Sequence, residues 1–363
     1  MTPIKILLLY AQSTQNKTLS YQIGWPKHFQ LHPKFRCAPI NVLEQGGMKY
    51  WRDRIRVKLA NFDAIIILHS VFSNGCALTG GMFDAVRTSA KPKAYFIGNE
   101  YKLMPEKMAF CESLNISLLI TMNPSPIAQA MYRDRLGCTV TCIPSSGLDT
   151  EIFYPMLDWE ERPLDIGYRS YESPLYLGHN ERSEIADGFL KNNNQYRLNL
   201  DISLDPEKRF TPVAWAKFLS QCKGQLGTEA GGDYFELTDN LRNQVNQYEK
   251  EHPDATMNEI FQKFFRDYPK PVPVRTISGR HVEAAGTKTI QILFEGNYNG
   301  YLQPDKHYIP LKRDFSNIDD AIAKFRDRDY AKQIAENAYK IATQQLTYKI
   351  LIDQFYEALI PLL

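Results

Sequence analysis

Short apolar runs alternate with amphipathic stretches along most of the chain. Apolar runs of about four to eight residues, separated by stretches long enough for a helix, are typical of buried strands in a parallel sheet. The runs that predict strands lie at residues 4–10, 62–69, 93–98, 116–122, 139–143, 164–169, 196–202, 222–226 and 290–294. Helical patterns lie at residues 105–114, 127–136, 183–191, 212–221, 318–325 and 331–363. This alternation predicts an α/β protein with doubly wound parallel sheets.

The alternation occurs twice, and a short irregular segment separates the two series. This segment, residues 144–155 (PSSGLDTEIFYP), contains Gly147, which allows a turn, and Pro155, which ends local structure. A chain of 363 residues is long enough for two domains with separate cores. We expect an N-terminal domain at 1–150, a second domain at 151–345 with a helical insertion at about 237–270, and a C-terminal helix at 346–363.

The composition is ordinary for a soluble globular protein. Hydrophobic residues make up 44% and charged residues 23% of the chain. No apolar run approaches the about 20 residues that span a bilayer. The six cysteines are scattered without a CxxC pair, and no signal peptide precedes the first strand. We therefore expect reduced thiols and a cytoplasmic location.

Charge is distributed unevenly between the two halves. The net charge is only +2, but residues 1–150 contain 17 Lys and Arg against 9 Asp and Glu, whereas the remainder contains 26 against 32. A basic first half suits an acidic partner, either a phosphorylated acceptor or an anionic membrane surface. Peripheral association with the inner face of a membrane is one expectation. A basic surface that contacts only solvent is the other.

The stretch RTISGRHVEAAGTKTIQILFE, residues 275–295, carries the strongest local signal for a ligand site. Ser278 and Gly279 stand where a helix N-cap belongs, so free backbone N–H groups and the positive helix end would face a ligand. Such a helix end binds diphosphates, with Arg280 as a bidentate clamp and Glu283 placed for hydroxyl groups. Alternatively, Glu283 only stabilises the helix dipole or pairs with Arg280.

Two further polar residues follow predicted strands of the second half. Glu229 lies in the glycine-rich loop LGTEAGG after the strand at 222–226, and Arg169 ends the strand at 164–169. Ligands bind at the carboxyl ends of strands in open α/β sheets. Arg169 therefore suits a phosphate, because its guanidinium matches phosphate oxygens.

In the first half, His69 and Glu100 occupy equivalent positions after predicted strands. Each is a candidate for the site, and Glu100 could orient acceptor hydroxyls or act as a base. The alternatives are a structural histidine and a surface carboxylate paired with Lys102 or Lys107.

Other kinds of site are disfavoured. The loop AQSTQNK after the first strand has no glycine, which a dinucleotide-binding turn requires. Asp327 and Asp329 form an Asp-x-Asp that could bind Mg²⁺ or Mn²⁺, but they lie in a charged helix start typical of a solvated face. The seven histidines show no zinc-binding spacing. Basic residues are not interleaved with aromatics, so no nucleic acid is expected.

These residues resemble the GT-B glycosyltransferases of the group 1 superfamily. In that family a strand ends near a first Glu, and the next helix carries a second Glu, then Ala and Gly, before another strand. Glu229 resembles the first, and Glu283, in VEAAGTKTIQI, resembles the second. About fifty residues separate them here, many more than in the family, so we interpret residues 237–270 as an insertion. The segment at 144–155 resembles the family's crossover between domains.

The resemblance implies two Rossmann-like domains that face each other across a cleft, with a C-terminal helix that braces the first. It implies a nucleotide-sugar donor bound without a metal or other cofactor. From the resemblance together with the strand ends and the helix start, we expect His69, Glu100 and Glu229 to act in catalysis. We expect Arg169, Glu229, Ser278, Gly279, Arg280 and Glu283 to bind the nucleotide-sugar.

We therefore predict a glycosyltransferase that moves a hexose-type sugar from a nucleotide-sugar to a saccharide or lipid-linked saccharide acceptor. The expected setting is surface polysaccharide or glycan biosynthesis, and the resemblance implies retention of anomeric configuration. Two alternatives stay open: a nucleotide-sugar epimerase with the same two-domain plan, and a non-catalytic subunit that binds nucleotide-sugars.

Overall fold

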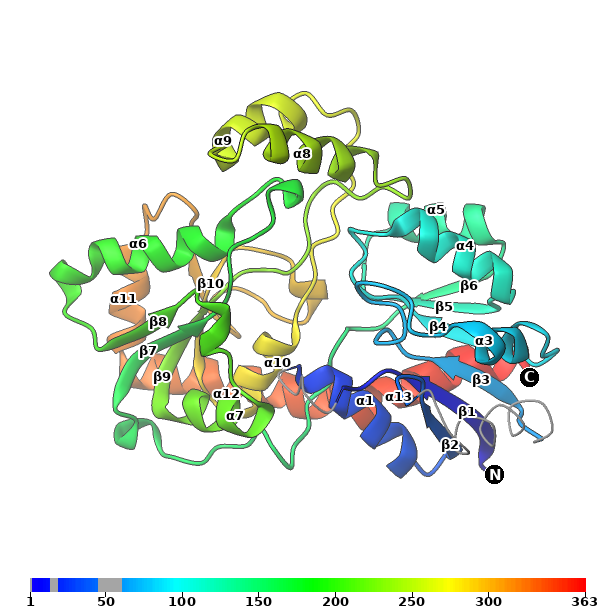
Figure 1. The fold of residues 1–363 in the computed structure, drawn as a ribbon. Helices are drawn as coiled ribbons and strands as arrows, with labels where there is room; N and C mark the ends of the chain where they lie inside the picture. The colour runs from blue at the N-terminus through cyan, green and yellow to red at the C-terminus, as the bar shows by residue number, and fades with distance from the viewer. Residues whose placement is uncertain (1, 14–18, 45–60) are drawn as a thin grey trace.

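The computed structural model describes residues 2–13, 19–44 and 61–363, which form two parallel sheets with helices on their faces (Figure 1). Within these residues the first sheet has the strand order β2-β1-β3-β4-β5-β6. Its strands are β1 (Ile4–Tyr10), β2 (Phe35–Asn41), β3 (Ala64–Ile67), β4 (Lys93–Phe96), β5 (Leu118–Thr121) and β6 (Thr139–Cys142). Its helices are α1 (Ser20–Leu31), α3 (Gly80–Arg87), α4 (Met104–Leu114) and α5 (Pro126–Leu136).

The second sheet has the order β11-β10-β9-β7-β8. Its strands are β7 (Leu164–Arg169), β8 (Leu200–Ser203), β9 (Cys222–Gly227), β10 (Ile290–Phe294) and β11 (Ile309–Leu311). The helices that cover it are α6 (Glu181–Tyr196), α7 (Pro212–Gln221), α10 (Gly279–Gly286), α11 (Ile318–Arg326) and α12 (Arg328–Gln345). The predicted α/β class with two doubly wound parallel sheets is confirmed.

The central strands are continuous apolar runs because helices cover both of their faces. In β1, the side chains from Ile6 to Leu9 are all 0% exposed, and β2 and β3 pair with it on either side. An alternating strand would leave every second residue in water. The apolar run in the sequence therefore indicates both a strand and its burial on both faces.

Three described elements of the first domain, α1, β2 and α3, escaped the sequence pattern. Helix α1 contains Gly24 and Pro26, both poor helix formers, and β2 contains Pro39. Gly24 is required by a distant contact, because a Cβ there would lie 2.3 Å from the ring of Tyr348. The glycine-free loop after β1 extends into residues 14–18, outside the described residues.

The strand predicted at 196–202 begins later than expected. Tyr196 still belongs to α6, and Arg197 ends the helix in the left-handed region with φ 54°. The side chain of Asn193 then bonds both backbone groups of Leu198. This local cap, which the apolar alternation does not reveal, moves the start of β8 to Leu200.

The two crossings of the chain between the domains lie side by side. The linker residue Leu148 donates its N–H to the carbonyl of Leu346 at 2.7 Å and forms a bridge with Thr347. Thr347 caps α13 (Tyr348–Leu359), which packs on α1 of the first domain through Phe355 and Phe29, with ring centroids 5.5 Å apart. These paired segments form the hinge of the molecule. The predicted helical tail is thus two helices with a break at the hinge.

The insertion between β9 and α10 forms a small helical unit at the top of the view in Figure 1. It contains α8 (Asn240–Glu251), α9 (Met257–Ile260) and a π-helical turn at Phe261–Phe265. Across the described parts of the chain, no helix is both long and apolar enough to cross a membrane.

Candidate functional site

A cavity lies between the carboxyl end of the second sheet and the start of α1. Its volume is about 220 Å³, and the loops after β7 and β9 line it together with the first turns of α6, α7 and α10. Residues 19–21 supply its wall from the first domain. Ligands of open parallel sheets bind at this edge. Of the predicted site residues, those that line the cavity are Arg169, Ser278, Gly279, Arg280 and Glu283.

Helix α10 begins at this cavity as the sequence predicted. Ser278 is its N-cap and forms a capping box with His281, whose Nδ1 accepts the N–H of Ser278 at 3.0 Å. Burial, and then the charge of Arg280, lowers the pKa of His281 to about 3, so this nitrogen stays free to accept. Gly279 allows close approach of the first domain, because a Cβ there would lie 2.9 Å from Oγ of Ser146. The cavity is thus bounded by a fixed, positive helix end.

Glu283 is a buried carboxylate on the inner side of the cavity. It accepts a hydrogen bond from Oγ of Ser20 in the first domain and one from Nε1 of Trp215 at 2.8 Å. Burial raises its pKa, although these two hydrogen bonds and the charge of Arg280 oppose the shift. Among the described residues Arg280 forms no ion pair with Glu283, and its Nη1 donates instead to Oγ of Ser170 at 3.5 Å.

Arg169 lies in the cavity wall but already has a counterion. Its Nη2 pairs with Asp201 at 2.8 Å, its Nη1 donates to the Asp201 carbonyl, and its guanidinium lies 4.4 Å from the ring centre of Phe218. A phosphate could bind Arg169 only through the edge of the guanidinium that does not face Asp201. Of the two predicted clamps, Arg280 is therefore the better placed.

Among the cavity residues that were not predicted are Tyr171, Arg182 and Arg209. The guanidiniums of Arg182 and Arg209 lie 4.5 Å and 5.3 Å from the ring centre of Tyr171. Nη1 of Arg182 is buried and has no hydrogen-bond partner among the described residues. Burial raises the pKa of Tyr171, but Arg182, Arg280 and Arg209 together bring it below the ordinary value.

The cavity therefore has a large excess of positive charge. Within the described part of the chain, Arg182, Arg209 and Arg280 form no ion pair with a carboxylate, and Glu283 is the single acid in the lining. Positive charges that gather at one cavity repel one another, and an anion bound among them relieves this repulsion. A position just inside a helix start could have indicated Arg182, whereas nothing in the sequence distinguishes Arg209.

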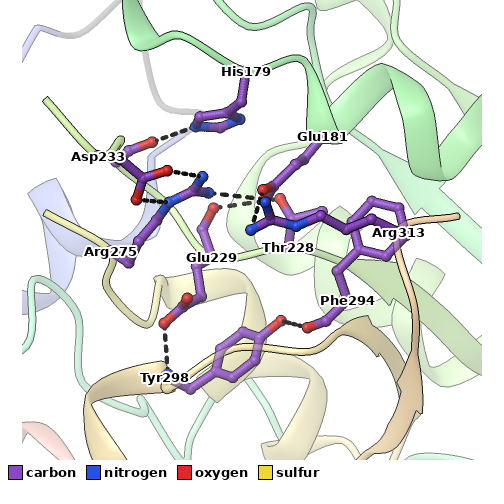
Figure 2. Close-up of polar contacts among 10 residues, drawn as sticks. His179, Glu181, Thr228, Glu229, Asp233, Arg275, Phe294, Tyr298 and Arg313 are labelled. Atoms are coloured by element: carbon purple, nitrogen blue, oxygen red, sulfur yellow. Dashed lines mark hydrogen bonds and ion pairs between the residues drawn. The ribbon is translucent and has the colours of Figure 1, made fainter. Parts of the chain in front are cut away.

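Glu229 does not enter the cavity, although its neighbours Thr228 and Ala230 line it. Figure 2 shows its carboxylate directed away, toward the loop after β10, where Oε1 accepts the N–H of Tyr298 at 2.6 Å. Burial raises its pKa. A Cβ at Gly296 would lie 2.6 Å from Oε2, so the carboxylate is closely enclosed. The structure thus ties Glu229 to the protein backbone.

A network of ion pairs lies beside Glu229 (Figure 2). Arg275 binds both carboxylate oxygens of Asp233, at 2.9 and 2.8 Å, and its Nη1 donates to Glu181 at 2.9 Å. Arg313 pairs with the other oxygen of Glu181 at 2.7 Å. Because Glu181 begins α6, the network fixes the helix turn that carries Arg182 into the cavity.

His69 lies behind the cavity wall of the first domain. Its ring stacks on that of Tyr21, with centroids 4.7 Å apart, and Tyr21 lines the cavity. Burial lowers the pKa of His69 to about 4, and its Nε2 has no partner among the described residues. His69 also lines a second, small cavity at the ends of β4, β5 and β6. It therefore lies one side chain away from the main cavity.

Glu100 is buried, so the alternative of a surface carboxylate paired with lysine is wrong. It accepts from Oγ1 of Thr121 at 2.5 Å, the hydroxyl of Tyr132 at 2.7 Å and the N–H of Met122 at 2.9 Å. Burial raises its pKa. Lys107 instead donates to three backbone carbonyls. Glu100 thus joins β5 to α5 within the first domain.

No group of three or more His, Cys, Asp or Glu side chains arranged to hold a metal ion occurs among the described residues. Asp327 of the Asp-x-Asp pair caps α12, accepting the N–H groups of Asp329 and Tyr330. The Asp-x-Asp pair therefore forms the start of a helix, in agreement with the predicted solvated helix start.

Comparison with solved structures identifies the fold. The chain is similar to sucrose-phosphate synthase from Thermosynechococcus elongatus, with 10% identity over 99% of each chain and a TM-score of 0.55. It is similar to Anabaena HepE in complex with UDP-glucose, with 12% identity over 99% of this chain and 100% of that one and a TM-score of 0.56. A DNA-modifying β-glucosyltransferase matches with 12% identity over 98% and 99% of the two chains and a TM-score of 0.58.

The shared architecture is GT-B, with two Rossmann-like domains, as the resemblance in the sequence implied. No family model matches the sequence, and no curated protein matches it.

Proposed function

We propose that this chain is a glycosyltransferase that uses a nucleotide-sugar donor and transfers a hexose-type sugar to a saccharide acceptor. The observation that carries the proposal is the interdomain cavity at the start of α10. There three guanidiniums meet, and none of them pairs with a carboxylate of the described residues. A diphosphate supplies the negative charge that this arrangement lacks. The GT-B fold supports the same reading by analogy.

The chemistry follows from the charge of the leaving group. When the bond between sugar and phosphate breaks, negative charge grows on the departing nucleoside diphosphate. Arg280, Arg182 and the N–H groups of α10 would stabilise that charge from fixed positions. A metal ion supplies this stabilisation in other transferases, so we propose a reaction that needs none.

Glu283 is suited to the ribose of the donor. A carboxylate accepts hydrogen bonds from vicinal hydroxyls, and those of the ribose would replace the bond from Ser20. Phe210 and Trp215, which line the same cavity with stacked rings 6.4 Å apart, offer an aromatic surface to the base. The acceptor would enter from the first domain, on the side of Tyr21 and His69.

The proposal extends to the setting of the reaction. The basic first half suits an acceptor in surface polysaccharide or glycan synthesis, presented at the inner face of a membrane. Transfer with retention is the stereochemical outcome that the resemblance implies.

A thermal-shift screen of nucleoside diphosphates and their sugars, including UDP and UDP-glucose, tests the donor. A bound ligand raises the melting temperature in proportion to RT ln(1 + [L]/Kd). We expect Arg280→Ala to weaken the binding of the stabilising nucleotide by about 10- to 100-fold, the loss of a charge-assisted contact. Glu283→Ala should abolish transfer while the fold persists. Arg328→Ala, on the exposed face of α12, is the matched control and should change neither.

A non-catalytic subunit is the second candidate, because Glu100 and Glu229, two residues predicted to be catalytic, are buried and bonded to the protein itself. Tight nucleotide binding without transfer to any saccharide acceptor would favour it. Consumption of donor in the absence of acceptor would favour an epimerase instead. Absence of stabilisation by every nucleotide would contradict all three.

A further inference from the structure

The insertion is attached to the body of the protein by a ladder of backbone hydrogen bonds. Ala230 and Thr276 exchange both of their bonds, at 2.9 and 3.0 Å, and the N–H of Phe235 donates to Val272 at 3.0 Å. We call the whole segment from residue 230 to residue 276 the strap. Its base lies at the cavity, since Ala230 is part of the lining.

The strap contacts the first domain through residues close to its base, although it belongs in sequence to the second domain. Phe235, Val272 and Val274 are all buried in the apolar core that includes the outer face of the first sheet. The ring of Phe235 lies 5.4 Å from that of Tyr132 on α5, between centroids. The strap therefore joins the two domains by an apolar interface.

Asp239 completes this attachment with a helix cap that comes from another domain. Helix α4 has Leu103 at its N-cap position, which offers no side-chain cap. The carboxylate of Asp239, at the start of α8, accepts the N–H of Leu103 at 2.6 Å and that of Met104 at 3.2 Å. Such a charged cap is among the stronger single contacts that can hold a helix end.

The strap and the hinge join the domains at two separate places, and Nδ2 of Asn299 in the second domain also donates to the carbonyl of Met122 in the first at 3.3 Å. In Figure 1 the insertion lies at the top of the view, whereas α12 and α13, on either side of the hinge, lie in its lower half. The cavity lies between them. Within it, the hydroxyl of Ser20 in the first domain donates a hydrogen bond to the carboxylate of Glu283 in the second. A ribose that takes over this hydrogen bond to Glu283 would replace a contact between the two domains.

Arg275 connects the strap to the cavity itself. It lies on the strap and binds Asp233 of the strap and Glu181 of α6 at once. Glu181 stands directly before Arg182, whose guanidinium faces the cavity. The strap and the turn that carries Arg182 are therefore connected through one network of ion pairs.

We propose that the strap is an interdomain clasp that keeps the cleft closed, and that release of Asp239 from the start of α4 admits and discharges the nucleotide. The rate at which nucleotide enters and leaves is then set by this contact as well as by the hinge. The part that concerns nucleotide rests on the proposed function; the closed state of the domains does not.

The test is a graded series, Asp239→Asn and Asp239→Ala, with Glu259→Ala as the matched control. Glu259 caps α9 within the same insertion through Thr256. We expect the Leu103 and Met104 amides to exchange hydrogen at least about tenfold faster in the alanine variant, the effect of losing one charge-assisted bond. Small-angle X-ray scattering should show a larger radius of gyration. UDP should dissociate about tenfold faster in stopped-flow measurements. The asparagine variant should fall between, and Glu259→Ala should match wild type.

An unchanged radius of gyration and an unchanged UDP dissociation rate, with faster exchange at Leu103 alone, would overturn the proposal and leave Asp239 as a simple cap. If wild type binds no nucleoside diphosphate, the proposed function fails. Scattering and hydrogen exchange then still decide whether the strap holds the domains closed.

Discussion

At the residue scale, the buried ionisable side chains divide into those with protein partners and those without. The carboxylate of Glu100 has three donors, whereas Nη1 of Arg182 and Nε2 of His69 have no partner among the described residues. A buried polar atom without a partner destabilises the fold by about 1–3 kcal/mol. Of these two atoms, Nη1 of Arg182 belongs to a residue of the cavity lining, and His69 stacks on Tyr21, which also lines the cavity.

His69 gives a prediction that depends on pH. Its pKa is lowered to about 4 in the folded chain, so below its ordinary value of 6.5 the unfolded chain binds a proton that the folded one does not. Stability must fall as pH decreases from 6.5 toward 4. His69→Phe keeps the stacking on Tyr21 but removes the imidazole that takes up a proton on unfolding. We therefore compare the free energy of unfolding of the variant with that of wild type at two pH values. The variant's advantage should be about 2 kcal/mol larger at pH 5 than at pH 7.5.

The measurement is urea denaturation of both proteins at each pH. A difference between them that stays constant over this range would contradict the buried, neutral histidine.

At the element scale, α10 combines a stabilising cap with a ligand-binding surface in one turn. The hydroxyl of Ser278 belongs both to its capping box and to the cavity lining. The N-cap of α12, Asp327, has only the capping role.

This comparison separates the two roles of Ser278. We expect Ser278→Ala and Asp327→Ala each to lower the free energy of unfolding by about 1 kcal/mol, the usual effect of losing an N-cap. Ser278→Ala alone should also weaken nucleotide binding, by about five- to tenfold, because its hydroxyl and a fixed first turn face the ligand. Chemical denaturation and calorimetry measure the two effects. Equal loss of affinity in both variants would show that stability, rather than the cavity, controls binding.

At the scale of the whole molecule, the hinge is held by charges as well as by the crossing segments. Asp149 of the linker pairs with Lys27 at 2.8 Å and His28 at 3.3 Å on α1. Burial alone would raise the pKa of Asp149, but the hydrogen bonds and charges of His28 and Lys27 lower it to about 2. A depressed carboxyl pKa stabilises the fold above its ordinary value, here 3.8, and this contribution is lost as pH falls through about 2.

Asp149→Asn should therefore lower the free energy of unfolding by about 2 kcal/mol at pH 6. The difference from wild type should shrink as pH decreases from 3.8 toward 2. Glu151→Gln is the control, because Glu151 pairs with the same Lys27 but is 72% exposed, and such surface pairs contribute at most about 1 kcal/mol. Thermal and urea unfolding across this pH range measure both. An equally large effect of Glu151→Gln would refute the conclusion that the buried position of Asp149 makes its ion pair the stronger one.

The sequence by itself determined the elements and the start of the site. Apolar runs fixed the positions of β1, β5 and β10, and a serine before a helical run fixed α10, because strand burial and helix capping depend on neighbours in the chain. Ser278, Gly279, Arg280 and Glu283 could be predicted together since they share one turn. The tertiary structure alone decided that Arg182, Arg209 and Tyr171 join them, since these residues come from three separate segments. It also turned Glu229 away from the cavity and placed Asp239 on α4. Such contacts depend on how the two sheets face each other, which no local pattern of residues records.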